Sequence, residues 1–147
     1  MKLKVAWIGK TKDASINELT ADYLKRIGRY TDVEGLSLPD QAALVKLREK
    51  SGMRPAHTIV LFDVLGKQLS SVEFAQFLQN HQDNNPQPLV LAIGPADGFS
   101  RETREAASAM LSFGKMTLAH ELARVVLVEQ IYRAFTILKG HPYHTGH

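Results

Sequence analysis

Two short runs of apolar residues place the strongest constraint on the fold of this chain. Thr58 to Val64 (TIVLFDV) is nearly all apolar, and Leu89 to Ile93 (LVLAI) is entirely so. Strands of this composition are covered on both faces, as they are in the middle of parallel sheets. We therefore expect a sheet with helices on both of its faces.

Strand-like and helix-like segments alternate along the rest of the chain. Further strands are expected at Leu3–Ile8, Val33–Leu38 and Phe113–Leu118. Helices are expected after a capping box at Ser15–Glu18, after Asp40, after a capping box at Ser70–Glu73, from Ser100 to about Leu111, and, with a threonine cap, from about Ala119 to Leu138. The pattern predicts an α/β fold on a mainly parallel sheet, with residues 1–147 as a single domain. Strand order does not follow from the pattern.

Composition narrows the class of protein. The chain has 147 residues, 44% of them apolar and 22% charged, which is typical of a globular domain with a core. The absence of cysteine excludes disulfides, thiol catalysis and cysteine-ligated metal sites. The N-terminus does not have the pattern of a signal peptide, and no apolar run reaches the ~18 residues of a membrane span. We expect a soluble cytoplasmic protein without a membrane partner.

The net charge of +3 is compatible with a phosphate-rich partner, but it is weak evidence for one because many soluble enzymes are equally basic. Ligands of open parallel sheets bind beyond the carboxyl ends of strands. Three stretches leave such ends: the one after Phe62, the loop Gly94–Gly98, and the run Phe113–Leu118. On pattern alone, a tight β–α turn is favoured over a ligand loop for Gly94–Gly98. Neither GxGxxG nor GxxxxGK[ST] occurs, so a hydride-transfer enzyme or an ATPase has little support.

The last helix carries polar residues on an otherwise apolar surface. His120 and Arg124 share one side of its N-terminal turns, where a helix favours anions, so they are either an anion site or structural. Glu129 and Arg133 form a second pair on another side. For that pair, a surface or interface salt bridge is favoured over catalysis.

The C-terminal tail is rich in histidine. His141, His144 and His147 suggest a metal site, but no carboxylate cluster accompanies them, so we do not expect a metal. A tail that folds over a pocket is the sharper hypothesis. Tyr143 would stack on a base or donate a hydrogen bond, and His144 would transfer a proton near neutral pH.

Several segments together resemble one known family. They are KLKVAWIGK, Tyr30-Thr31, FDVLGK from Phe62, IGPADG, LSFGKMTLAHELARVVLVEQIYRAFTILKG and the terminal HPYH. This combination resembles the ribosomal RNA large subunit methyltransferase H family, of the SPOUT superfamily of knotted methyltransferases. The likeness spans nearly the whole chain and is most specific in the last forty or so residues.

The resemblance implies an enzyme with a defined cofactor and substrate. It implies a homodimer whose C-terminal part, about residues 89–147, is threaded into a deep trefoil knot that binds S-adenosylmethionine. The expected reaction is methylation of N3 of a pseudouridine in large-subunit (23S) ribosomal RNA on assembled ribosomes. Two alternatives stay open: a SPOUT methyltransferase acting on transfer RNA, and a ribosome-binding factor without enzymatic activity. The helix 119–138, apolar on nearly every side, is itself a candidate dimer interface.

The resemblance also assigns site residues. The expected cofactor-binding residues are Phe62, Gly94, Phe113, Gly114, Lys115, Met116, Thr117 and Leu118. His120, Arg124, Tyr143 and His144 match the polar pocket and tail residues of the family. Of these, His144 is the preferred proton acceptor, Tyr143 would orient the base, and Arg124 would bind phosphate or developing negative charge. The chain departs from the family pattern at Pro95, where a second glycine is usual, and at Ala119, where proline is usual.

Overall fold

Each strand of the sheet runs parallel to its neighbours. The computed structural model describes residues 1–145, whose five strands lie in the order β2-β1-β4-β3-β5. The strands are β1 (Lys2–Ile8), β2 (Asp32–Leu38), β3 (Thr58–Gln68), β4 (Leu89–Ile93) and β5 (Ala109–Ser112). The helices are α1 (Ala14–Ile27), α2 (Gln41–Lys46), α3 (Ser71–Asn84), α4 (Arg101–Ala106) and α5 (His120–Leu138). The expected α/β class is confirmed.

The two apolar runs form neighbouring strands in the sheet. β4 is the middle strand, between β1 and β3, and all five of its residues are buried. Ile59, Val60 and Leu61 of β3 are buried beside it. The prediction of central strands covered on both faces is confirmed.

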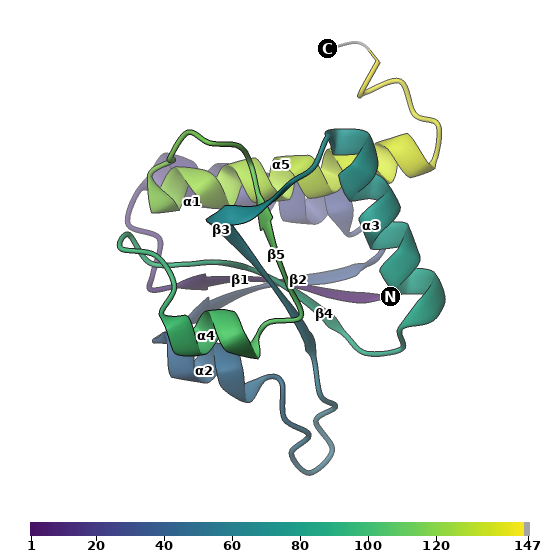
Figure 1. The fold of residues 1–147 in the computed structure, drawn as a ribbon. Helices are drawn as coiled ribbons and strands as arrows, with labels where there is room; N and C mark the ends of the chain where they lie inside the picture. The colour runs from purple at the N-terminus through teal and green to yellow at the C-terminus, as the bar shows by residue number, and fades with distance from the viewer. Residues whose placement is uncertain (146–147) are drawn as a thin grey trace.

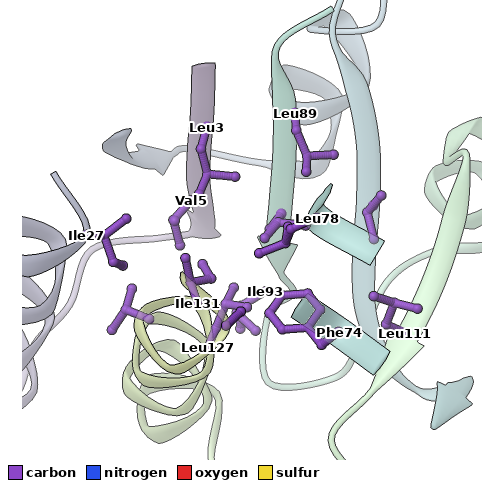
Figure 2. Close-up of a cluster of buried hydrophobic side chains, with 14 of the residues drawn as sticks. Leu3, Val5, Ile27, Phe74, Leu78, Leu89, Ile93, Leu111, Leu127 and Ile131 are labelled. Carbon is purple, nitrogen blue, oxygen red and sulfur yellow. The ribbon is translucent and has the colours of Figure 1, made fainter. Parts of the chain in front are cut away.

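Alternate residues of each strand enter two separate cores. Leu89, Leu91 and Ile93 pack under α1, α3 and α5, whereas Val90 and Ala92 face the layer of α2 and α4. Figure 1 shows these two helix layers above and below the sheet, and Figure 2 shows the larger core. Each fully buried leucine contributes about 1.5–3 kcal/mol, so this strict alternation fixes the register of the sheet.

α5 is the main helix of the larger core. It packs against both α1 and α3 as well as the sheet, and Leu127, Val128 and Ile131 are fully buried. Much of its apolar surface is therefore covered within the chain. At its first turn, by contrast, Leu122 remains 45% exposed.

The segment between β4 and α5 differs from expectation. The helix expected up to about Leu111 ends at Ala106, and the strand expected at 113–118 instead comprises Ala109–Ser112. The physical reason is pairing: residues 109–111 lie beside Val60 to Phe62 and complete the edge of the sheet. A short apolar run does not reveal by periodicity whether it is helix or strand. Residues 113–119 form a loop.

One of the two expected capping boxes is present. Ser70 and Glu73 satisfy each other's backbone N–H groups at the start of α3, as predicted. The box beginning at Ser15 is wrong, because Asp13 caps α1 instead. The Asp13 carboxylate accepts hydrogen bonds from the N–H groups of Ser15 and Ile16 at 2.8 and 3.2 Å.

Within residues 1–145, no helix is both long enough and apolar enough to cross a membrane.

A buried histidine precedes β3. The side chain of His57 is only 2% exposed, and its Nδ1 lies 3.1 Å from the carbonyl oxygen of Leu47. Its Nε2 is buried without a hydrogen-bond partner among the described residues. Burial, with a smaller contribution from the charge of Lys4, lowers the pKa of His57 below its ordinary value of 6.5.

The lowered pKa predicts a pH dependence of stability. In the unfolded chain His57 takes up a proton near its ordinary pKa of 6.5, whereas the folded protein resists that proton. Stability is therefore full above pH 6.5 and falls as the pH drops towards the folded pKa, by at most about 1.4 kcal/mol per pH unit. Urea unfolding of wild type and His57→Gln at pH 7.5 and 5.5 should show a smaller loss in the variant. An equal loss in both would contradict the assignment; His81→Gln serves as the control.

Candidate active site at the carboxyl end of the sheet

A pocket lies at the carboxyl ends of β3, β4 and β5. Its volume is about 280 Å³, near the lower end of small-molecule sites. Three loops and the first turn of α5 form its walls. These are the three strand-end stretches that the sequence singled out, and the fold brings them together.

The wall from β3 is aromatic. The ring of Phe62 stacks on that of Phe113, with 4.7 Å between centroids and 20° between planes. Phe74 of α3 meets the Phe62 ring edge-on at 5.8 Å. The stack gives the pocket a flat apolar surface, suited to the face of a planar ring.

Beyond Phe62, β3 bulges outward before it rejoins β5. Phe62 and Lys67 both pair with Leu111, so residues 63–66 are extra to the ladder. Gly66 permits this, since a Cβ there would lie 2.4 Å from the carbonyl oxygen of Leu111. The bulge carries Asp63 and Val64 into the pocket wall.

The loop after β4 is both a tight turn and a pocket wall. The N–H of Gly98, at φ +84°, donates to the carbonyl of Pro95 at 2.9 Å. Gly94 is buried, and a Cβ there would sit 3.1 Å from the ring of Phe99. The two interpretations left open by the sequence are therefore compatible.

The loop after β5 supplies the third wall. Gly114 has φ +139°, and its N–H and carbonyl both bond to the hydroxyl of Ser112, at 3.1 and 2.8 Å. The lining residues from this loop are Phe113, Gly114, Met116, Thr117 and Leu118. The Lys115 side chain is exposed and does not line the pocket in the described structure.

α5 begins at the pocket without a side-chain cap. The expected threonine cap is wrong: the N-cap is Ala119, and no side chain bonds to the first turn. His120 and Ala123 line the pocket at this turn. Free N–H groups at a helix N-terminus favour a negatively charged ligand group, such as a carboxylate.

Arg124, one turn further on, is directed elsewhere. Its side chain is 1% exposed, and its guanidinium donates to Thr11 Oγ1 at 2.7 Å and to the carbonyl of Ile8 at 3.0 Å. It also lies over the ring of Trp7, 5.8 Å from the centroid. Burial lowers the pKa of Arg124, although the group stays a cation at neutral pH. Its observed contacts are with the end of β1, not with the pocket.

Glu121 also joins the start of α5 to the β1–α1 loop, a role that the sequence did not predict. Its carboxylate accepts hydrogen bonds from the N–H groups of Lys12 and Asp13 at 2.9 and 3.0 Å. These bonds, chiefly the one from Asp13, lower the pKa of Glu121. Together Glu121 and Arg124 hold the β1–α1 loop against the start of α5.

Tyr143 and His144 lie at the opposite end of α5. Nineteen helical residues separate the pocket from the tail, about 28 Å at 1.5 Å per residue. Figure 1 shows the tail leaving the C-terminal end of α5, whereas the pocket loop enters α5 at its N-terminal end. The structure thus brings His120 to the pocket, but not the tail of the same chain.

The tail is held by an aromatic and ionic cluster. The Tyr143 ring meets that of Tyr132 edge-on at 4.8 Å, and its hydroxyl is 3.5 Å from that of Tyr23. Arg133 lies 5.1 Å from the Tyr143 ring centroid and pairs with Glu129 at 2.6 Å. The salt bridge expected for Glu129 and Arg133 is confirmed.

Two properties of the tail bear on proton transfer. Burial, and then the hydrogen bond with Tyr23, raise the pKa of Tyr143 to about 12, so its phenol stays protonated. His144 Nδ1 is shielded and has no hydrogen-bond partner among residues 1–145. His147 lies outside the described residues. No three acidic or histidine side chains in the described part of the chain lie together as a metal site would require.

Sequence reasoning missed part of the lining. The lining residues to which the sequence assigned no individual role are Asp63, Val64, Ile93, Pro95, Ala96, Asp97, Gly98, Phe99, Ser112 and Ala123. Most of them lie in the same strand-end loops as the expected residues. The available signal was therefore the position of each loop after a buried strand, which identifies a whole loop and not single side chains.

The chain is similar to known methyltransferases. The family model described as predicted SPOUT methyltransferase matches residues 1–144. A ribosomal RNA large subunit methyltransferase H from Koribacter versatilis is 56% identical over 147 residues, covering 100% of both chains. One of the same name from Geotalea daltonii is 41% identical over 152 residues, covering 98% of this chain and 99% of its own.

Two solved structures share the fold. A probable methylase family protein from Haemophilus influenzae has a TM-score of 0.61 at 10% identity, over 96% of this chain and 69% of its own. A putative methyltransferase from Legionella pneumophila, solved in complex with bound SAM, has a TM-score of 0.50 at 16% identity, over 91% and 66%. The chain belongs to the ribosomal RNA large subunit methyltransferase H family of SPOUT methyltransferases.

Proposed function

We propose that this protein is an S-adenosylmethionine-dependent methyltransferase that methylates N3 of a pseudouridine in large-subunit ribosomal RNA on assembled ribosomes. The observation that carries the proposal is the pocket. Seven of the eight cofactor-binding residues inferred from the family resemblance line it, Lys115 being the exception. Relatives that match the whole chain are named for methylation of large-subunit ribosomal RNA.

The pocket has features that suit S-adenosylmethionine. The Phe62–Phe113 stack offers an apolar surface to an adenine ring, and the uncapped start of α5 offers N–H groups to a carboxylate. Gly94 keeps its wall free of a side chain. When bound, the cofactor supplies an electrophilic methyl group. The residues must then hold the acceptor nitrogen in line and exclude water.

The acceptor nitrogen must lose a proton, and the tail supplies groups for this. His144 is the proposed proton acceptor, since an imidazole nitrogen can accept a proton and pass it on. Tyr143, whose pKa is raised to about 12, does not accept the proton, so it orients the base by stacking or hydrogen bonding. Arg124 is held by Thr11 and Ile8, so an anion-binding role would require it to leave them.

The separation of pocket and tail supports a homodimer. A tail about 28 Å from its own pocket meets a pocket only if a partner subunit presents one. Exposed apolar side chains lie on the bulge of β3, on the loop after β5 and on the first turn of α5, where a second copy would cover them. They are Val64, Leu65, Met116, Leu118 and Leu122.

The remaining features of the proposal come from the family. We expect a trefoil knot within residues 89–147, in the single domain 1–147, and an enzyme that acts in the cytoplasm where ribosomes assemble. The alternatives are a transfer RNA methyltransferase and a ribosome-binding factor without activity.

The main test is methyl transfer from radiolabelled S-adenosylmethionine. Ribosomes lacking the modification, free large-subunit RNA and transfer RNA are the three substrates. We expect label in assembled ribosomes, at a pseudouridine identified by mapping the modified nucleotide. Label in transfer RNA would favour the first alternative. Absence of both cofactor binding and transfer would favour the second.

Replacing Phe113 with leucine should weaken cofactor binding. Phe113→Leu keeps an apolar side chain but removes the stacked ring, a loss of about 1 kcal/mol, or roughly fivefold in Kd. Calorimetric titration with S-adenosylmethionine measures it. Phe77→Leu is the matched control, because Phe77 stacks on Phe74 and does not line the pocket in the described structure. Equal affinity of Phe113→Leu and wild type would exclude the stack as a binding surface.

Mixed dimers test whether the tail acts across the subunits. His144→Ala removes the proton acceptor, and Gly94→Val blocks the pocket, because Phe99 leaves no room for a branched side chain. Each variant alone should be inactive. Mixing them should restore about one quarter of wild-type activity if the partner's tail is used, since half of the dimers are mixed and each holds one complete site. No recovery after subunit exchange, confirmed by mass spectrometry, would place the tail on its own pocket.

A further inference from the structure

One short segment, residues 46–54, is strongly basic, and we name it the basic hairpin. It contains Lys46, Arg48, Lys50 and Arg54 with a single acidic residue, Glu49. Its net charge is therefore +3, equal to that of the whole chain. Basic and acidic side chains balance over all the other residues. A modest overall charge thus hides a local concentration, which is the more informative quantity for an anionic partner.

The hairpin is an ordered projection. Ser51 and Arg54 exchange backbone hydrogen bonds of 3.1 and 2.8 Å, and Gly52 turns the chain at φ +56°. At its base, the N–H of His57 donates to the carbonyl of Leu47 at 2.8 Å. Figure 1 shows the segment between α2 and β3 extending away from the body of the molecule. The backbone that carries these charges is therefore ordered before binding, so only the side chains lose conformational freedom when a partner binds.

The cations of the hairpin are available to a partner. None of them is in an ion pair within the described residues, and Lys46, Arg48 and Lys50 are exposed. Among residues 1–145, their only side-chain hydrogen bond is a long one, 3.4 Å from Arg48 to the carbonyl of Ala106. At the tip, Met53 is 101% exposed. A fully exposed methionine between cations does nothing for the core, but it suits contact with a base or sugar.

The hairpin and the pocket lie at opposite ends of β3. The hairpin precedes the first residue of β3, and the pocket lies beyond Phe62 on the same strand. The strand alone separates them by about 17 Å, at 3.3 Å per residue. That span corresponds to roughly five base steps, at 3.4 Å per step. One nucleotide cannot reach both places, although one folded RNA can.

We propose that the basic hairpin binds the phosphate backbone of ribosomal RNA at a place remote from the methylated nucleotide. Its cations contact phosphates, and Met53 packs on an adjacent base or sugar. Such contacts are independent of sequence and supply affinity and orientation, leaving selection of the nucleotide to the pocket. The proposal rests on the proposed function, since it takes ribosomal RNA as the substrate.

A triple substitution tests the hairpin against a matched control. Lys46→Gln/Lys50→Gln/Arg54→Gln removes three charges from the hairpin, and Lys2→Gln/Lys25→Gln/Arg29→Gln removes three that also lie outside ion pairs. Ribosome binding is measured by filter retention over a range of salt concentrations, independently of methyl transfer. The hairpin variant should bind about tenfold more weakly, and the slope of log K against log salt should fall by about 2. The control should match wild type.

The kinetic signature separates this role from one in the pocket. The hairpin variant should raise KM for ribosomes and leave kcat and the Kd for S-adenosylmethionine unchanged. Met53→Ser should raise KM without changing the salt slope. Wild-type ribosome binding by the hairpin variant would overturn the inference while leaving the proposed function intact. A hairpin variant that binds ribosomes normally but no longer binds phosphatidylserine vesicles would also overturn it, because the hairpin would then be a membrane-binding segment. Failure of the wild-type enzyme to methylate ribosomes would instead reject the proposed function.

Discussion

Burial of β4 on both faces is the constraint from which the rest of the structure follows. A strand without an exposed residue needs a neighbour on each side and a helix layer above and below, which β1, β3 and the five helices provide. Because its neighbours run parallel to it, the carboxyl ends of all three strands lie at the same end of the sheet. The pocket lies at that end, so the apolar character of Leu89–Ile93 indirectly determines where the candidate site forms.

Arg124 shows the energetic cost of holding the end of β1 against the start of α5. A guanidinium that is 1% exposed has lost most of its hydration, and two hydrogen bonds and the face of Trp7 offset only part of this loss. In return it ties the end of β1 to the first turns of α5, next to the bonds made by Glu121. The uncapped start of α5 is therefore fixed by side chains that point away from the pocket, and its N–H groups remain available.

Sequence predicted the parts of this structure that depend on local pattern. The central strands, the Ser70–Glu73 box and the three loops that line the pocket follow from apolar runs and their ends. The structure of the segment from Ala106 to Leu118 could not be predicted in this way, because residues 109–111 become a strand only by pairing with β3. Likewise the spacing of His120 and Arg124 predicts a shared side of a helix, but a turn of the helix between them is enough to give them different neighbours. Long-range partners decide such cases, and periodicity does not contain them.

The pocket and the C-terminal tail, both assigned to the proposed reaction, lie at opposite ends of α5. The pocket lies at its first turn, and the cluster around Tyr143 holds the tail at its last. The Glu129–Arg133 pair, half-buried beneath the Tyr143 ring, gives the tail a defined orientation in place of a frayed end. A rigid helix cannot bend to bring its ends together, so the proposed role of the tail in catalysis requires a pocket other than its own. In the proposed homodimer, the same rigidity would hold each tail at a fixed position relative to the partner's pocket, so that each subunit would complete the other's site.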